Sequence, residues 1–177
     1  MANDPFHGLP EVPSFTLTSR LVKDGGELAL PQFSGIFGVP GGEDTSPDLA
    51  WSGAPAATES YAVTMYDPDA PTGSGFWHWA VVNLPSDVTA LREGAGSSDD
   101  SLPPGAFHLA NDGGARRFVG AAPPAGHGRH RYFLVVHALA VRDPGVSPDA
   151  TPAFLGFTMA AHIVGRAVLT ATAEIPA

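Results

Sequence analysis

The sequence predicts a β-rich domain with long loops, and three observations support this prediction. Glycine and proline account for 21 and 18 of the 177 residues and are spread between short apolar runs, as is typical of strands joined by turns. Residues 60–66 show the two-residue alternation of a strand. Residues 76–84 and 131–141 are longer apolar runs rich in β-branched and aromatic side chains. We therefore expect these three segments to be the central strands.

The weaker elements follow from the same alternation and turn signals. We expect weak strands at residues 14–18 and 28–33 and a short strand at residues 117–120. Residues 87–104 are polar and contain clustered glycine, serine and aspartate, so we expect a surface loop there. No internal repeat is evident, and a chain of 177 residues can bury one substantial core. The sequence therefore predicts a single domain spanning residues 1–177.

One α-helix is predicted near the C-terminal end. Thr151 is a suitable N-cap, and Pro152 suits the first helical position. Apolar side chains then recur at helical spacing, at Phe157, Ala161, Val164 and Val168. This spacing predicts a helix from residue 151 to about residue 170 that packs on the sheet. His162 and Arg166 would share one face of it, for which a solvated or interface face is the simplest interpretation.

Composition excludes several classes of function. A formal net charge of −9, with Lys23 as the single lysine, argues against nucleic acid or an anionic membrane surface as the main partner. There is no cysteine, so disulfides, a thiol nucleophile and a zinc-thiolate site are excluded. No apolar run approaches the roughly 18 residues that would span a bilayer, and residues 1–9 lack the features of a signal peptide. We therefore expect a cytoplasmic protein without integral membrane association and without a cofactor.

The first group of chemically interesting residues is Asp67-Pro68-Asp69-Ala70-Pro71, followed by a histidine on the next strand. Strand alternation predicts that His78 lies on the same face as Phe76, Ala80 and Val82, with Trp77, Trp79 and Val81 on the other face. A buried histidine satisfied by a backbone carbonyl is the simpler interpretation. The nearby carboxylates favour a binding site instead, because a carboxylate would fix the tautomer and favour protonation.

The second group is the glycine- and proline-rich loop of residues 120–128. Four of the nine cationic side chains lie near it, namely Arg116, Arg117, Arg129 and Arg131, and they predict a local positive region in an acidic protein. Backbone amides of the turn from Gly120 to Ala122 would add donors for an anion. The alternative is an ordinary surface loop whose arginines pair with distant acids.

The histidines after this loop separate into two sets. Alternation places His130 on the same face as Tyr132 and His137 on the opposite face. His127 and His130 are three residues apart, which is a weak signal for a metal because no accompanying acid or helix is present. We therefore expect no metal.

Several motifs together resemble the phosphatidylethanolamine-binding protein family, most closely its bacterial, Raf-kinase-inhibitor-like branch. They are Asp67-Pro68-Asp69-Ala70-Pro71, the strand Phe76-Trp77-His78-Trp79 to Val82-Asn83, the Pro123-Pro124 turn and Gly128-Arg129-His130-Arg131-Tyr132. The resemblance extends from about Phe15 to Val168. It implies a mainly β fold, in which a large central antiparallel sheet packs on a smaller sheet, with a few peripheral helices including one near the C-terminus.

The resemblance also implies a binding site for a small anion such as phosphate, phosphorylethanolamine or a carboxylate. The implied ligand-binding residues are Asp67, His78, Gly120, Ala122, Pro123, Pro124 and His130, with Phe76 and Tyr132 as walls. Asp67 would orient a histidine or meet a ligand ammonium, and Asp69 would brace its turn. Pro71 is a candidate for a cis peptide bond. Bacterial relatives are often homodimers, so a homodimer is also implied.

Three functions remain open at this point. The first is a binding module without enzymatic activity that recognises a small anion, with a phospholipid headgroup as one candidate ligand. The second is a regulatory protein that acts on a kinase, a hydrolase or another partner. The third is a weak hydrolase with His78 or His130 as general base. The absence of cysteine and of a Gly-x-Ser-x-Gly motif argues against an enzyme.

Overall fold

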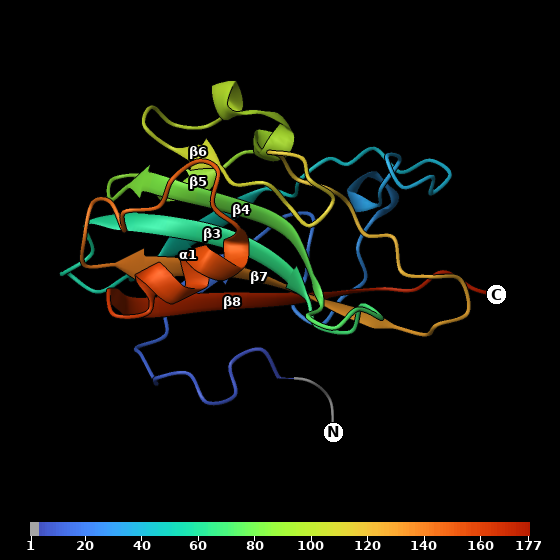
Figure 1. Cartoon of the computed structure of the whole chain (residues 1–177), viewed down its shortest axis with the longest axis horizontal. Coiled ribbons are helices and arrows are strands. Elements are labelled where there is room, and N and C mark those ends of the chain that lie inside the picture. The colour runs from blue at the N-terminus through green and yellow to red at the C-terminus, as the bar shows by residue number, and fades with distance from the viewer. Residues whose placement is uncertain (1–3) are drawn as a thin grey trace.

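The computed structural model describes residues 4–177, and its centre is a five-stranded antiparallel sheet (Figure 1). The strand order is β6-β4-β3-β7-β8. The bounds are β3 Ser60–Asp67, β4 Phe76–Pro85, β6 Phe107–His108, β7 His130–Leu139 and β8 Ile163–Ala173. The three predicted central strands are therefore confirmed as β3, β4 and β7, which lie side by side.

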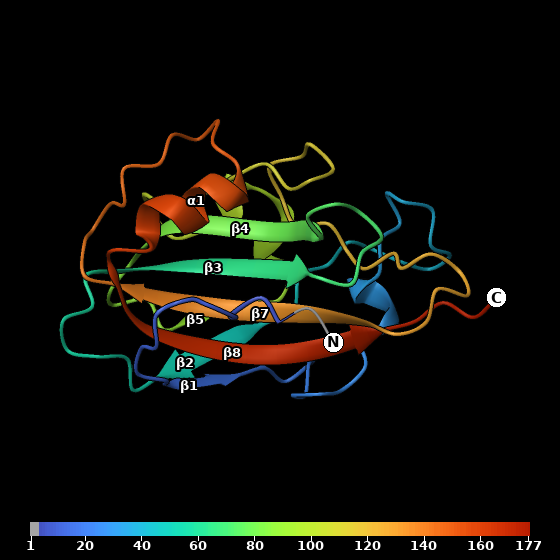
Figure 2. The ribbon, with the colours of Figure 1, turned by 60° about the horizontal axis from the view of Figure 1, so that its bottom comes forward.

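Within residues 4–177, a second, three-stranded sheet and four short helices complete the fold. The small sheet has the order β1-β2-β5, with β1 Thr16–Thr18, β2 Leu49–Ser52 and β5 Ala90–Leu91. The helices are α1 Pro152–Met159 and the 3₁₀ turns η1 Leu30–Gln32, η2 Ala95–Ser97 and η3 Asp99–Ser101. Figure 2 shows α1 beside β4, with β1 and β2 next to β8. The mainly β architecture with two sheets is thus confirmed.

Alternation along the strands produces two hydrophobic cores. One face of the large sheet, with Val63 and Val81, packs against Leu49 and Leu91 of the small sheet. The other face, with Ala62, Ala80 and Val82, packs against Leu155 and Met159 of α1. Burying each large aliphatic side chain contributes roughly 1.5–3 kcal/mol. The two-sided burial therefore holds β3, β4 and β7 rigidly and fixes the loops at their ends.

Two of the three weaker strand predictions are wrong. Residues 28–33 contain the 3₁₀ turn η1, where Pro31 has no amide hydrogen to give to a ladder. Residues 117–120 form no strand, because the Phe118 amide bonds to the Gly96 carbonyl and the Val119 amide to the His78 carbonyl. Residues 14–18 correspond to β1, which is shorter than predicted.

The predicted surface loop at residues 87–104 is more structured than its composition indicates. It contains β5, η2 and η3, and Leu91 and Ala95 are buried in the core between the sheets. Gly96 packs so closely against Phe118 that a Cβ at position 96 would collide with the Phe118 side chain. The small residues of this segment let its backbone pack closely against the rest of the protein. The same residues are also typical of surface loops, which is why the composition was misleading.

The predicted helix of residues 151–170 is correct only at its start. Thr151 accepts the Phe154 amide as an N-cap, but α1 ends at Met159. Val164 and Val168 belong to β8, which pairs with β7 over ten residue pairs. His162 and Arg166 consequently share no helical face. Tertiary pairing decided this segment, because its β-branched residues fit a strand at least as well as a helix.

Two further properties concern all of the residues that the structure describes. All peptide bonds in residues 4–177 are trans, so the prediction of a cis bond at Pro71 is wrong. Within the same residues, no helix has the length and apolar character needed to cross a membrane.

Candidate functional site

The cavity in which the sequence predicts an anion, called the anion pocket, has a volume of about 230 Å³ and lies where β3 ends and β4 and β7 begin. Eight of the nine predicted ligand-binding residues line it: Asp67, Phe76, His78, Ala122, Pro123, Pro124, His130 and Tyr132. Asp67 is the last residue of β3, Phe76 the first of β4 and His130 the first of β7. The strand pairing therefore brings together groups that are far apart in the sequence.

Asp67 is buried and uses both carboxylate oxygens. Its Oδ1 accepts the amides of Asp69 and Ala70 at 2.7 and 3.0 Å, which closes the turn after β3. Its Oδ2 lies 2.7 Å from Nδ1 of His130. Because a carboxylate can only accept, Nδ1 of His130 carries the proton. Asp67 thus fixes both the loop and the tautomer of His130.

His78 is held in a similar way by a different acceptor. Its Nδ1 lies 3.0 Å from the Val119 carbonyl oxygen, so this nitrogen is protonated and Nε2 is the side available to a ligand. The ring packs on Phe76 and Tyr132, with centroid distances of 4.7 and 5.2 Å. Burial lowers the pKa of His78, which favours the neutral imidazole.

A β-bulge at His78 changes the faces that alternation predicts. Met65 pairs with Trp79 and Tyr66 with Trp77, so β4 has one extra residue, His78, between these pairs. The prediction that His78 shares a face with Phe76 is correct, but its grouping with Ala80 and Val82 is wrong. Trp79 packs in the core between the sheets, on the side of His78, whereas Trp77 faces the other side with Tyr66.

His127 extends the pair of Asp67 and His130 toward the surface. Its Nδ1 lies 2.7 Å from Nε2 of His130, and its side chain is exposed. Since Nδ1 of His130 donates to Asp67, Nε2 of a neutral His130 accepts a hydrogen bond from Nδ1–H of His127. A row of three groups therefore leads from a buried carboxylate to an exposed imidazole.

The predicted positive region is largely neutralised, because three of its four arginines pair with acids; Arg117 instead donates to the Phe118 carbonyl. Arg116 pairs with Asp99, and Arg129 with Glu27. The remaining pair is the tightest: Arg131 donates from its backbone amide, Nε and a terminal nitrogen to Asp69, and this charge holds the pKa of Asp69 below its usual value. Asp69 consequently ties the loop to β7, and the bracing of the turn that we expected of it is done by Asp67.

Two of the three turn amides expected to bind an anion donate within the protein instead. The Gly120 amide donates to Oδ1 of Asp44 at 2.8 Å, and the Ala121 amide donates to the Gln32 carbonyl. Gly120 does not line the pocket, and a Cβ at this position would collide with the Phe33 carbonyl group. Its glycine is therefore needed for close packing behind the pocket rather than for a ligand contact.

Comparison with known proteins is consistent with this architecture. The family model described as phosphatidylethanolamine-binding protein matches residues 18–174. The chain belongs to the phosphatidylethanolamine-binding protein family. It is 43% identical to the UPF0098 protein YbcL of Escherichia coli over 93% of this chain and 90% of that protein. It is also 43% identical to YbhB of E. coli, over 88% of this chain and 97% of that protein.

Solved structures of the phosphatidylethanolamine-binding protein family have the same fold. The crystal structure of E. coli YbcL, described as a new member of the mammalian family, matches with a TM-score of 0.88 and 44% identity over 92% of this chain and 99% of that one. The family member from Plasmodium vivax matches with a TM-score of 0.58 at 16% identity, over 97% of this chain and 90% of that one. The second match supports the fold alone.

Some pocket residues of this family member were not predicted from the sequence. They are Phe37, Ala70, Pro71 and Thr72. Ala70 and Pro71 belong to the acidic motif itself, so their place beside Asp67 could have been inferred. Phe37 is half-exposed and packs edge-on against Phe76 at 6.0 Å. The available signal in the sequence was an apolar, aromatic pair flanked by glycines, Gly35-Ile36-Phe37-Gly38.

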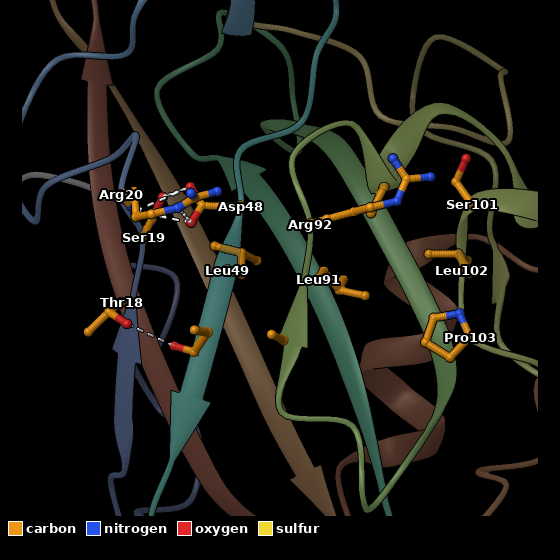
Figure 3. A pocket seen from close by; sticks show the side chains of 13 residues that line it. Thr18, Ser19, Arg20, Asp48, Leu49, Leu91, Arg92, Ser101, Leu102 and Pro103 are labelled. Atoms are coloured by element: carbon orange, nitrogen blue, oxygen red, sulfur yellow. Dashed lines mark hydrogen bonds and ion pairs between the residues drawn. The ribbon is translucent and has the colours of Figure 1, made fainter.

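A larger cavity, of about 780 Å³, lies over the small sheet (Figure 3). The carboxylate of Asp48 in this cavity already accepts hydrogen bonds from Oγ of Ser19 and Nε of Arg20, at 3.0 Å each. Figure 3 shows Arg92 across the cavity from this pair, with Leu49 and other aliphatic side chains between them. The two exposed arginines of this cavity, Arg20 and Arg92, lie on opposite sides of it and do not converge, so the anion pocket remains the better candidate.

Proposed function

We propose that this protein binds small anions in the anion pocket, namely phosphate, phosphorylethanolamine or a carboxylate, without chemical turnover. The observation that supports this most is the way in which His78 and His130 are held. Each imidazole is anchored through Nδ1 to an acceptor of the protein, at 3.0 and 2.7 Å, which leaves Nε2 as the ligand side. Two imidazoles fixed in this way in one cavity are suited to donate to a shared anion once they are protonated.

Proton uptake is part of the proposed binding. In the neutral state Nε2 of His78 is an acceptor and cannot donate to an anion. An anion that lacks a proton therefore requires the imidazolium form, which the nearby carboxylate of Asp67 favours and burial opposes. At His130, the ligand would replace the exposed His127 on Nε2.

The size of the pocket favours a headgroup rather than a whole lipid. A volume of about 230 Å³ corresponds to roughly eight water-sized groups at about 30 Å³ each. Phosphorylethanolamine has a comparable number of heavy atoms. In that ligand the ammonium would lie near Asp67, whose carboxylate is the buried acid of the pocket. Binding of a phospholipid headgroup is proposed on this basis.

A weak hydrolase is the second candidate, favoured by the contact between Asp67 and His130. A histidine oriented by a carboxylate can activate water as a general base. Against it, the hydroxyl groups lining the pocket are those of Thr72, which donates to the Gly75 carbonyl, and Tyr132, whose pKa is raised by burial. A regulated protein partner, a homodimer and a cytoplasmic location stay predictions from the sequence.

Titration with phosphate and with O-phosphorylethanolamine tests the proposal. The ring resonances of His78 and His130 are expected to shift, and His78→Gln is expected to weaken binding at least tenfold, because it removes one charge-assisted hydrogen bond. His162→Gln is the matched control, since His162 lies in the turn after α1 and does not line the pocket. If neither ring responds at millimolar ligand, the binding proposal is wrong. Ester hydrolysis that disappears in His130→Gln would favour the hydrolase instead.

A further inference from the structure

A second cavity, here called the rear cavity, lies on the opposite face of the large sheet. It has a volume of about 270 Å³ and lies between residues 5–12, the strands β3, β7 and β8, and α1. Figure 2 shows the N-terminal segment crossing in front of β7, with α1 above it. The β7 side chains in this cavity, Phe133, Val135 and His137, alternate with His130 and Tyr132 of the anion pocket. The two cavities therefore have separate walls.

Two buried polar atoms in the rear cavity have no hydrogen-bond partner. They are Nδ1 of His137 and Nε of Arg166. The two residues face each other in the pairing of β7 with β8, so their side chains lie on the same face. A buried donor without a partner carries a penalty that most proteins avoid. Two such atoms side by side point to a ligand group that would satisfy both.

Both atoms can act as donors. Nε of an arginine always carries a hydrogen. His137 is 6% exposed, and Oγ1 of Thr64 lies 3.2 Å from its Nε2. When the threonine hydroxyl donates to Nε2, the hydrogen of the neutral ring lies on Nδ1. Burial and the charge of Arg166 lower the pKa of His137 to about 3, so the ring is neutral. The pair thus presents one cation and two N–H donors.

The surroundings provide no counter-charge. Among the residues that the structure describes, no aspartate or glutamate lines the rear cavity. The guanidinium of Arg166 lies over the ring of Phe6 at 5.3 Å, which stabilises the cation without neutralising it. Burial lowers the pKa of Arg166. An incoming anionic group would therefore meet an unneutralised, partly desolvated arginine.

We propose that the rear cavity binds a small amphipathic carboxylate, with its carboxylate on Arg166 and His137 and its apolar chain against Val135, Met159 and Ile163. The walls are predominantly apolar, as in sites that take a hydrocarbon body with few fixed polar contacts. A volume of about 270 Å³ corresponds to roughly nine water-sized groups, close to the size of octanoate. A phosphate group would need more donors than these two. The proposal does not depend on the function of the anion pocket.

Octanoate is the probe, with binding followed by calorimetry and by the ring resonances of His137, His78 and His130. We expect octanoate to shift the ring resonances of His137 in the wild-type protein, both with and without added phosphate. Arg166→Met should weaken octanoate at least tenfold, because a hydrogen bond to a charged group is lost. Arg142→Met is the matched control, since Arg142 pairs with Glu59 on the surface. Octanol should bind more weakly than octanoate and be unaffected by Arg166→Met.

A second variant fills the rear cavity and leaves the charge of Arg166 in place. Gly156 lines the rear cavity from α1, and a Cβ there would contact nothing within 4 Å. Gly156→Leu should therefore fold and fill the cavity, and it should abolish the octanoate response while the phosphate response of His78 persists. Equal octanoate affinity in wild type, Arg166→Met and Gly156→Leu would overturn the proposal. A response of His78 and His130 without His137 would likewise overturn it, because octanoate would then occupy the anion pocket.

Discussion

Replacing Asp67 by asparagine tests how the anion pocket is organised. In the wild type, Oδ1 accepts two turn amides and Oδ2 accepts Nδ1–H of His130. Asparagine keeps one acceptor for the amides but presents an NH₂ group to His130. Nδ1 of His130 must then become an acceptor, so its proton moves to Nε2. We expect Asp67→Asn to reverse the tautomer of His130 while the turn is retained.

The cost in stability can be worked out from these contacts. A hydrogen bond to a charged group contributes about 1.5–3 kcal/mol and a neutral one about 0.5–1.5 kcal/mol. Exchanging the charged bond at His130 for a neutral one should lower the free energy of unfolding by about 1–2 kcal/mol. Asp67→Ala leaves two turn amides and the imidazole unpaired, and at about 1–3 kcal/mol each it should cost at least about 3 kcal/mol.

Urea unfolding measures the free energy, and imidazole ¹⁵N spectra report the tautomer. Asp69→Asn is the matched control, because Asp69 binds Arg131 instead of a histidine. This control should lose a similar free energy and keep the wild-type tautomer of His130. If Nδ1 of His130 remained protonated in Asp67→Asn, the assigned role of Asp67 in fixing the tautomer would be refuted.

Three further outcomes follow from the structure. The folded-state pKa of His137 is about 3 and its unfolded value is 6.5. The wild type should therefore lose about 2.3 kcal/mol of unfolding free energy through this group between pH 6.5 and 4.5. Urea unfolding at the two pH values should show a smaller loss for His137→Gln. Sulfate should bind more tightly as pH falls from 8 to 6, by up to about tenfold per unit, since His78 must gain a proton; a constant Kd would contradict this. Gly120→Ala should lower the free energy of unfolding by about 1–3 kcal/mol, because its Cβ collides with the Phe33 carbonyl group. Gly156→Ala, whose Cβ enters the rear cavity without a collision, should raise the free energy of unfolding by up to about 1 kcal/mol. Equal effects of the two substitutions would refute the role of Gly120 in close packing.

The sequence predicted the strands with a clear two-residue period better than the other elements. β3, β4 and β7 have long apolar or alternating runs, and the structure confirms all three. The segment after Met159 was misjudged because Val164 and Val168 satisfy a helical period as well as a strand. The alternation of buried Gly165, Ala167 and Leu169 was present but is made of small residues, whose period is weak.

The sequence predicted most of the residues that line the anion pocket, but it did not predict how the charged and hydrogen-bonding groups around the pocket are paired. The pairing of Arg131 with Asp69 joins positions 62 residues apart, which no local pattern indicates. The bulge at His78 changes which residues share its face, and a single inserted residue leaves no mark on an apolar run. Likewise, two of the three turn amides expected to bind an anion, those of Gly120 and Ala121, donate to Asp44 and Gln32. Long-range partners decided each of these points.

A crystal structure of this protein grown with O-phosphorylethanolamine would show whether the two anchored histidines bind a phosphoryl group. We expect density for the phosphoryl group within hydrogen-bond distance of Nε2 of both His78 and His130, with His127 displaced from His130 and the ammonium toward Asp67. Ligand density elsewhere on the protein, with the contact between His127 and His130 intact, would show that the anion pocket is not the binding site.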